Sequence, residues 1–141
     1  MCLGIFFTGV RNNSLKKAAR YRGEEPSRPD LPWREDLEKT SRRFALKYLL
    51  GVVNSTVAHD FLRANRRSNT DLYPDDWKKL PIPDVDSTVQ APLIKLVDHI
   101  LDVKKADPSA DTTALEREID QLVYVLYGLA DEEIAIVEGR E

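Results

Sequence analysis

The fold of this chain is decided by the stretch Thr113-Ala-Leu-Glu-Arg-Glu-Ile-Asp-Gln-Leu-Val-Tyr-Val-Leu-Tyr-Gly128. Its apolar residues recur three and four positions apart, which is the spacing of one face of an α-helix. Gly128 follows at a position where a left-handed residue commonly ends a helix. The stretch therefore predicts an amphipathic helix, whose inner face should comprise Leu115, Ile119, Leu122, Val123 and Leu126.

A second helix is predicted just before this one. Pro92 suits the first turn of a helix, and an apolar stripe follows it. The polar residues 106–111 form a short loop between the two helical patterns. We therefore expect residues 87–141 to form an antiparallel helical hairpin. Its core should also include Leu93, Val97 and Ile100, with Ile94, Tyr124 and Tyr127 on the outside, where they could meet a partner.

A third helical pattern begins near residue 41. Thr40 or Ser41 could cap its first turn. Asn54 and Ser55 lie in its middle, where their side chains can bind the backbone and start a separate second helix. The spacing predicts an inner apolar stripe of Leu46, Leu49, Leu50, Val53, Val57 and Phe61.

The other segments lack a periodic pattern. Three prolines within residues 26–32 exclude a helix there, and a short strand is predicted at Leu3–Phe7. The prolines on either side of Ile82 demand an extended backbone, at best an edge strand. The predicted fold is mainly α, with an irregular or partly β segment over residues 1–40. A helix, a loop and the Leu-Pro-Ile-Pro strand then occupy residues 41–86, and the hairpin occupies residues 87–141.

Charge is distributed unevenly along the 141 residues, although the net charge is only −3. Residues 11–70 hold 14 Lys and Arg against 7 Asp and Glu, whereas residues 71–141 hold 7 against 17. This asymmetry fits a basic half that faces a polyanion such as nucleic acid. It fits equally well two halves of one domain that attract each other.

The cysteine content and the first ten residues bear on the compartment. The single cysteine, Cys2, excludes an internal disulfide and fits a reducing environment. The apolar start, Met1–Val10, is too short to span a membrane, and no basic residue precedes it as in a signal peptide. We therefore expect a cytoplasmic protein without a membrane partner, and we read the apolar start as a sign of truncation from a longer chain.

No catalytic or metal-binding constellation stands out. His59 and His99 are 40 residues apart, and each neighbours the apolar stripe of a helix. Asp75 and Asp76 follow a proline and suit a turn, and the same holds for the acidic pair at 84 and 86. The glycines form no phosphate-binding loop. We therefore expect no catalysis and no cofactor in this chain.

The candidate binding residues cluster around the end of the third helical pattern. Phosphates are neutralised by Lys and Arg, whereas base edges are read by polar side chains as well. Both types occur here within a short stretch, and two lysines return after a loop. The alternative is a solvated helix end, where cations are favourable in any case. The candidate DNA-binding residues are Arg63, Asn65, Arg66, Arg67, Asn69, Lys78 and Lys79.

Two stretches resemble a known family. Tyr48-Leu-Leu-Gly-Val-Val-Asn-Ser55 followed by Tyr73-Pro-Asp-Asp-Trp-Lys-Lys-Leu-Pro-Ile-Pro83 resembles the end of target-recognition domains in type I and type IIG restriction-modification enzymes. The segment Leu115–Leu129, with Glu132-Glu-Ile134 after it, resembles the C-terminal tail of the fused type IIG adenine methyltransferases. Their order and spacing also agree with that family, over about residues 46–138.

The resemblance implies a DNA-reading module. The parent enzyme would recognise an asymmetric sequence in double-stranded DNA and methylate adenine with S-adenosylmethionine, with endonuclease activity left open. The chain lacks the family's Asn-Pro-Pro-aromatic motif, its cofactor-binding glycine motif and a nuclease motif. It would therefore be a DNA-docking segment that packs against the methyltransferase or endonuclease portion. The alternative is a helical module for protein–protein interaction, including a homodimer.

Overall fold

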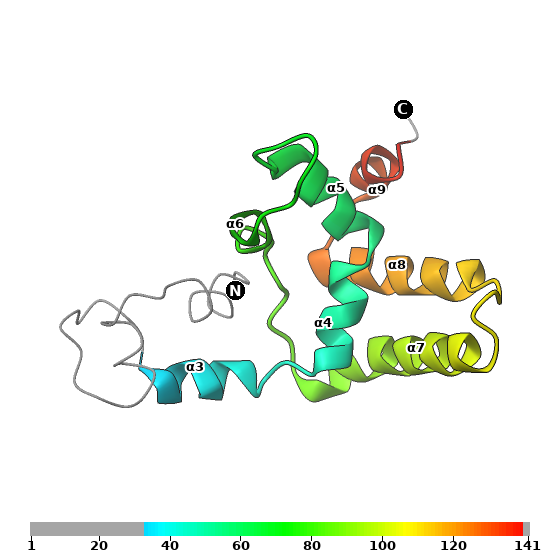
Figure 1. The fold of residues 1–141 in the computed structure, drawn as a ribbon, viewed down its shortest axis with the longest axis horizontal. Coiled ribbons are helices and arrows are strands. Elements are labelled where there is room, and N and C mark those ends of the chain that lie inside the picture. The colour runs from blue at the N-terminus through cyan, green and yellow to red at the C-terminus, as the bar shows by residue number, and fades with distance from the viewer. Residues whose placement is uncertain (1–32, 140–141) are drawn as a thin grey trace.

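A computed structural model describes residues 33–139 of the chain. This part is mainly helical, as predicted, and contains no strand (Figure 1). The strand predicted at Leu3–Phe7 lies outside the described residues. The helices are α3 (Arg34–Ser41), α4 (Leu46–Val53), α5 (Thr56–Asn65), α6 (Pro74–Trp77), α7 (Ser87–Ala106), α8 (Thr113–Tyr127) and α9 (Asp131–Val137).

The two longest helices, α7 and α8, follow each other and lie side by side (Figure 1). Gly128 ends α8 in the left-handed conformation with φ 66°, as its position predicted. The expected place of Pro92 in the first turn of α7 is wrong. The helix begins earlier, at Ser87, because the Asp86 carboxylate accepts hydrogen bonds from the N–H groups of Thr88 and Val89 and caps it. Pro92 consequently lies inside the helix.

The break between α4 and α5 confirms the interpretation of Asn54 and Ser55. Helix α4 ends at Val53, and Ser55 becomes the N-cap of α5, where its hydroxyl accepts a hydrogen bond from the N–H of Ala58. The expected cap at Thr40 or Ser41 is wrong, since α4 starts only at Leu46. Both residues lie at the end of α3 instead.

Helix α3 also overturns part of the irregular segment predicted over residues 1–40, which is wrong for residues 34–40. The prolines end before it, so they do not prevent it. Its first turn carries Glu35 and Asp36, whose charges suit a helix N-terminus. Arg34 and Glu38 form an ion pair along its surface at 2.5 Å.

One hydrophobic core joins segments from both halves of the described chain. Helix α4 packs most extensively on α7, and α7 packs on α8. Of the predicted hairpin core, Leu93, Val97, Ile119 and Val123 are buried, and Ile100, Leu122 and Leu126 pack at its edge. The prediction is wrong for Leu115, which is only partly buried and does not pack against the core. The buried apolar residues are Phe44, Tyr48, Val52, Val57, Ala58, Leu62, Leu80, Ile82, Leu93, Val97, Ile119, Val123 and Tyr124.

The apolar stripe predicted for α4 is partly wrong. The helix buries Tyr48, Gly51 and Val52, whereas Leu46 is 83% exposed and Leu50 is also exposed. Helix α4 has apolar residues almost all round, so spacing alone does not identify the face that packs. The close approach of α7 selects the face that carries Gly51.

Replacing Gly51 with alanine is expected to destabilise the fold by about 1–2 kcal/mol, because the gain in helix propensity is smaller than the cost of overpacking. A Cβ at this position would lie 3.0 Å from Cγ of Leu93 and 3.2 Å from Cγ2 of Val97. Urea denaturation followed by circular dichroism measures the change. A variant as stable as the wild type would mean that α4 and α7 can move apart enough to fit the methyl group without loss of folding free energy.

The tyrosines predicted on the outer side of the hairpin contribute to the interior instead. Tyr124 is buried, and its hydroxyl donates to a Glu138 carboxylate oxygen at 3.0 Å. Tyr127 is half-buried, and its hydroxyl donates to the carbonyl of Pro81. Ile94 packs against the core as well. The expectation that these three side chains face a partner is therefore wrong.

Residues 80–83, which we call the proline strap, cross the core in an extended conformation. No strand includes them within residues 33–139, so the predicted edge strand is wrong. Leu80 and Ile82 are buried, and the Tyr48 hydroxyl donates to the Pro83 carbonyl at 2.8 Å. Burial raises the pKa of Tyr48 to about 12 and also raises the pKa of Tyr127. Both phenols therefore remain donors at neutral pH.

A buried glutamine holds the entry to α4 against the start of α7. Gln90 Nε2 donates to the carbonyls of Arg43 and Val85 at 2.7 and 2.8 Å, and Gln90 Oε1 accepts from the N–H of Ala45 at 3.1 Å. This one side chain thus satisfies three backbone groups of two segments that lack regular structure.

Candidate nucleic-acid interface

The candidate interface is the edge of the molecule where α5 ends and α6 begins (Figure 1). Helix α5 ends at Asn65, and Arg66 adopts an extended conformation that directs the chain away from the helix axis. After a loop and the single turn of α6, the chain returns beside the end of α5. There Lys79 Nζ donates to the carbonyl of Asn65 at 3.2 Å. The fold thus places the two predicted basic segments side by side.

Asp76 forms the centre of this edge and is fully buried. One of its carboxylate oxygens accepts a hydrogen bond from the N–H of Tyr73 at 3.0 Å, which fixes the first turn of α6. The other oxygen lies 3.9 Å from both Arg67 Nε and Lys79 Nζ and has no hydrogen-bond partner. The carboxylate therefore attracts two cations at a distance longer than a hydrogen bond.

Arg67 is held loosely and faces outward. Its guanidinium lies 3.6 Å from an Asp75 carboxylate oxygen and 5.1 Å from the centre of the Tyr73 ring. Its side chain remains about half-exposed. The guanidinium thus makes no hydrogen bond to either carboxylate and keeps about half of its surface open to solvent.

The two lysines after α6 differ in availability. The Lys78 side chain is only 15% exposed and donates to Asp75 at 2.9 Å. The Lys79 side chain is 48% exposed and has its nearest carboxylate oxygen at 3.9 Å. These two neighbouring lysines thus differ in their surroundings, and the Lys79 side chain is the more exposed of the two.

The remaining candidates are arranged around this centre. Arg63 pairs with Asp60 at 2.5 Å on the exposed side of α5. Arg66 is half-buried, and its Nε has no hydrogen-bond partner. Asn69 is exposed in the loop. The backbone of the loop is less available than the sequence suggested, because the N–H groups of residues 70 and 71 lie within hydrogen-bonding distance of the Ser68 hydroxyl.

The charges of this edge nearly cancel. Residues 60–79 hold four carboxylates, at residues 60, 71, 75 and 76, against the five cations Arg63, Arg66, Arg67, Lys78 and Lys79. The carboxylates of Asp75 and Asp76 were read from the sequence as turn residues only. Asp76 does fix the turn, but both also anchor the cations, which sequence spacing did not reveal. The edge can present cations to phosphate but is not a strongly basic surface.

The histidines and carboxylates of the described residues bear on a catalytic or metal centre. Within residues 33–139, no group of three or more His, Cys, Asp or Glu side chains is arranged to hold a metal ion. His59 and His99 lie on different helices, and both are exposed. Over the same residues, no helix has the length and apolarity needed to cross a bilayer.

Comparisons with protein-family models, with curated proteins and with solved structures gave no match for this chain. The family resemblance of the two stretches therefore remains a prediction. The function has to be argued from the arrangement of the side chains.

Proposed function

We propose that the chain is a DNA-docking segment that grips the phosphate backbone through the edge formed by α5 and α6. The proposal rests on one observation: Arg67 and Lys79, from segments on either side of a loop, meet over the buried carboxylate of Asp76. The buried Asp76 carboxylate attracts both cations to one place, and about half of each side chain remains exposed. Such a pair suits contact with neighbouring phosphates, which set the position of a protein on a duplex.

In this proposal the chain contributes binding and has no catalysis of its own. The family resemblance supplies the setting, a restriction-modification enzyme whose methyltransferase or endonuclease portion packs against this segment. Base-specific reading would need polar side chains such as Asn69 in the loop and Asn65 at the end of α5, whose amide now donates to the Phe61 carbonyl at 2.8 Å. S-adenosylmethionine would be bound by the other portion of the parent.

The availability of the two lysines yields a matched test. Binding to a 20-base-pair duplex is measured by fluorescence anisotropy at several salt concentrations. The logarithm of the binding constant falls with the logarithm of the salt concentration, with a slope of about −0.9 for each phosphate that the protein neutralises. We expect a slope of about −3 to −4 for the wild type. Lys79→Ala should make it shallower by about 0.9, whereas Lys78→Ala should leave it unchanged because that ammonium is already paired.

A second pair of substitutions addresses the arginines. Arg66→Ala with Arg67→Ala should make the slope shallower by about 2 and leave the circular dichroism spectrum unchanged. Equal slopes for wild type, the Lys79 variant and the double arginine variant would assign these residues to a solvated helix end and refute the proposal.

A further inference from the structure

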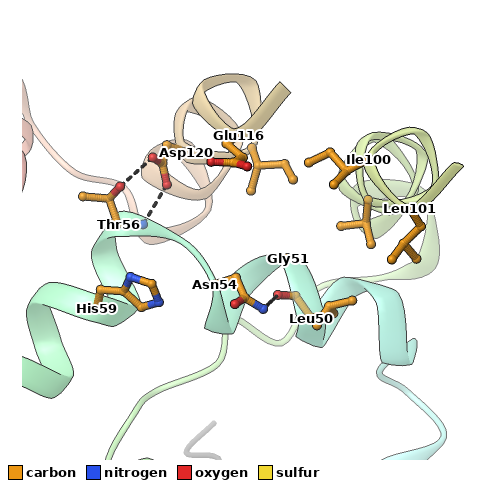
Figure 2. A pocket seen from close by; sticks show the side chains of 11 residues that line it. Leu50, Gly51, Asn54, Thr56, His59, Ile100, Leu101, Glu116 and Asp120 are labelled. Atoms are coloured by element: carbon orange, nitrogen blue, oxygen red, sulfur yellow. Dashed lines mark hydrogen bonds between the residues drawn. The ribbon is translucent and has the colours of Figure 1, made fainter. Parts of the chain in front are cut away.

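A groove on a different part of the surface lies between α4, α5, α7 and α8. It measures about 480 Å³, large enough for several side chains of a partner. Figure 2 shows Ile100 and Leu101 on one wall, the carboxyl groups of Glu116 and Asp120 on another, and His59 at one end. The candidate DNA-binding residues do not line it.

The floor of the groove continues as an apolar strip along α4. Leu46 and Leu50 are one helical turn apart on the same face and both are exposed, and Leu101 lies across from them and is also exposed. From Leu46 to Leu50 the strip covers one helical turn, about 6 Å, and polar Asn54 follows it in the groove. Apolar side chains one turn apart, with Leu101 on the other wall, suit the apolar face of a helical segment.

The polar rim of the groove is acidic. No lysine or arginine lines it among the described residues, and neither of its carboxylates has an ion pair there. Glu116 accepts a hydrogen bond from the Thr112 hydroxyl at 2.6 Å. Asp120 accepts from the N–H and the hydroxyl of Thr56 at 2.7 and 2.6 Å, and so caps α5. All these donors are neutral, so neither carboxylate forms an ion pair among the described residues, and Arg117 lies beside Asp120 only in a neighbouring hollow.

We propose that this groove binds a basic amphipathic helix of a partner protein, whose apolar face covers Leu50 and Leu101 while its lysines or arginines meet Glu116 and Asp120. The charge of the rim selects the occupant, because an acidic helix would be repelled and a purely apolar one would leave the carboxylates desolvated without a counter-ion. The proposal does not depend on the DNA-docking function.

The probe is a fluorescein-labelled peptide of about 16 residues with leucines at i, i+3 and i+7 and lysines elsewhere. Its matched control carries glutamates in place of the lysines. Binding to the full chain is measured by anisotropy at low salt. We expect the basic peptide to bind and the acidic peptide not to bind. Leu101→Lys should weaken binding of the basic peptide at least tenfold, since it places a cation on the apolar wall of the groove.

Three further measurements make the result specific. Val125→Lys is the matched control, because Val125 is 79% exposed and does not line the groove, and it should leave binding unchanged. Glu116→Gln should weaken binding and reduce its salt dependence. Equal binding of both peptides, or an equal effect of the two lysine variants, would overturn the proposal. So would a wild-type dimer in sedimentation that Leu101→Lys converts to monomer, since the occupant would then be a second copy.

Discussion

A Gln90→Leu variant is expected to lose about 2–4 kcal/mol of folding free energy, because three backbone groups lose their partner in a place that water reaches poorly. Leucine restores apolar contacts but cannot accept from the N–H of Ala45 or donate to the carbonyls of Arg43 and Val85. Urea denaturation at neutral pH measures the loss. A change below about 0.5 kcal/mol would mean that these groups are hydrated or paired without Gln90.

A Gln90→Glu variant separates hydrogen bonding from shape. The carboxylate keeps the acceptor for Ala45 but turns an oxygen toward two carbonyls, so it should be as unstable as the leucine variant at pH 7. Burial raises the pKa of the introduced carboxyl above that in the unfolded chain, so the folded state binds the proton more tightly. The deficit relative to the wild type should therefore shrink as the pH falls toward about 5. A deficit that grows over this range would contradict the assignment.

A Leu93→Ala variant is expected to be destabilised by about 3–5 kcal/mol, which combines the lost transfer free energy with the cavity left between α4 and α7. Leu93 is 1% exposed. Leu101 lies on the same helix but is 44% exposed, so Leu101→Ala should cost less than about 1 kcal/mol and is the matched control. Chemical denaturation of the two variants compares them directly.

The Leu93→Ala substitution should reverse the sign of the stability change that Gly51→Ala causes. Two of the three atoms nearest to the added Cβ belong to Leu93, at 3.0 and 3.1 Å. In the Leu93→Ala background the methyl group enters the space that the leucine vacated, so Gly51→Ala should then stabilise the protein. The two substitutions should thus be strongly non-additive. Additive effects would show that the helices shift as rigid bodies instead.

The sequence predicted two helix ends that local chemistry decides. Ser55 and Gly128 act at the positions expected from their side-chain or backbone preferences. It predicted the packed face of α4 poorly, because apolar residues nearly surround that helix and only the approach of α7 selects one side. The start of α7 was also misplaced. Asp86 caps that helix, and Pro92 lies in its interior rather than in its first turn.

The sequence was enough to predict which cations belong to the candidate site, but not which carboxylates lie among them. Proximity in sequence was enough to group Arg66 and Arg67, and Lys79 follows them after a loop. That Asp76 would be fully buried between Arg67 and Lys79 depends on the path of the loop, which no spacing rule gives. The exposed Leu46 and Leu50 illustrate the same limit, since periodicity assigned them to the core.

The contact between Lys79 and the carbonyl of Asn65 brings together the two ends of the segment that joins α5 to the proline strap. Within this segment α6 packs on α5 and Trp77 packs against the core, whereas residues 69–73 are exposed. The conformational entropy lost in closing such a loop grows only logarithmically with its length, so a doubling would cost roughly 0.6 kcal/mol. Residues 68–72 can therefore gain insertions or exchange their sequence while the helices keep their packing. In the proposed DNA-docking function, the contacts of this edge can thus diversify independently of the helices that carry it.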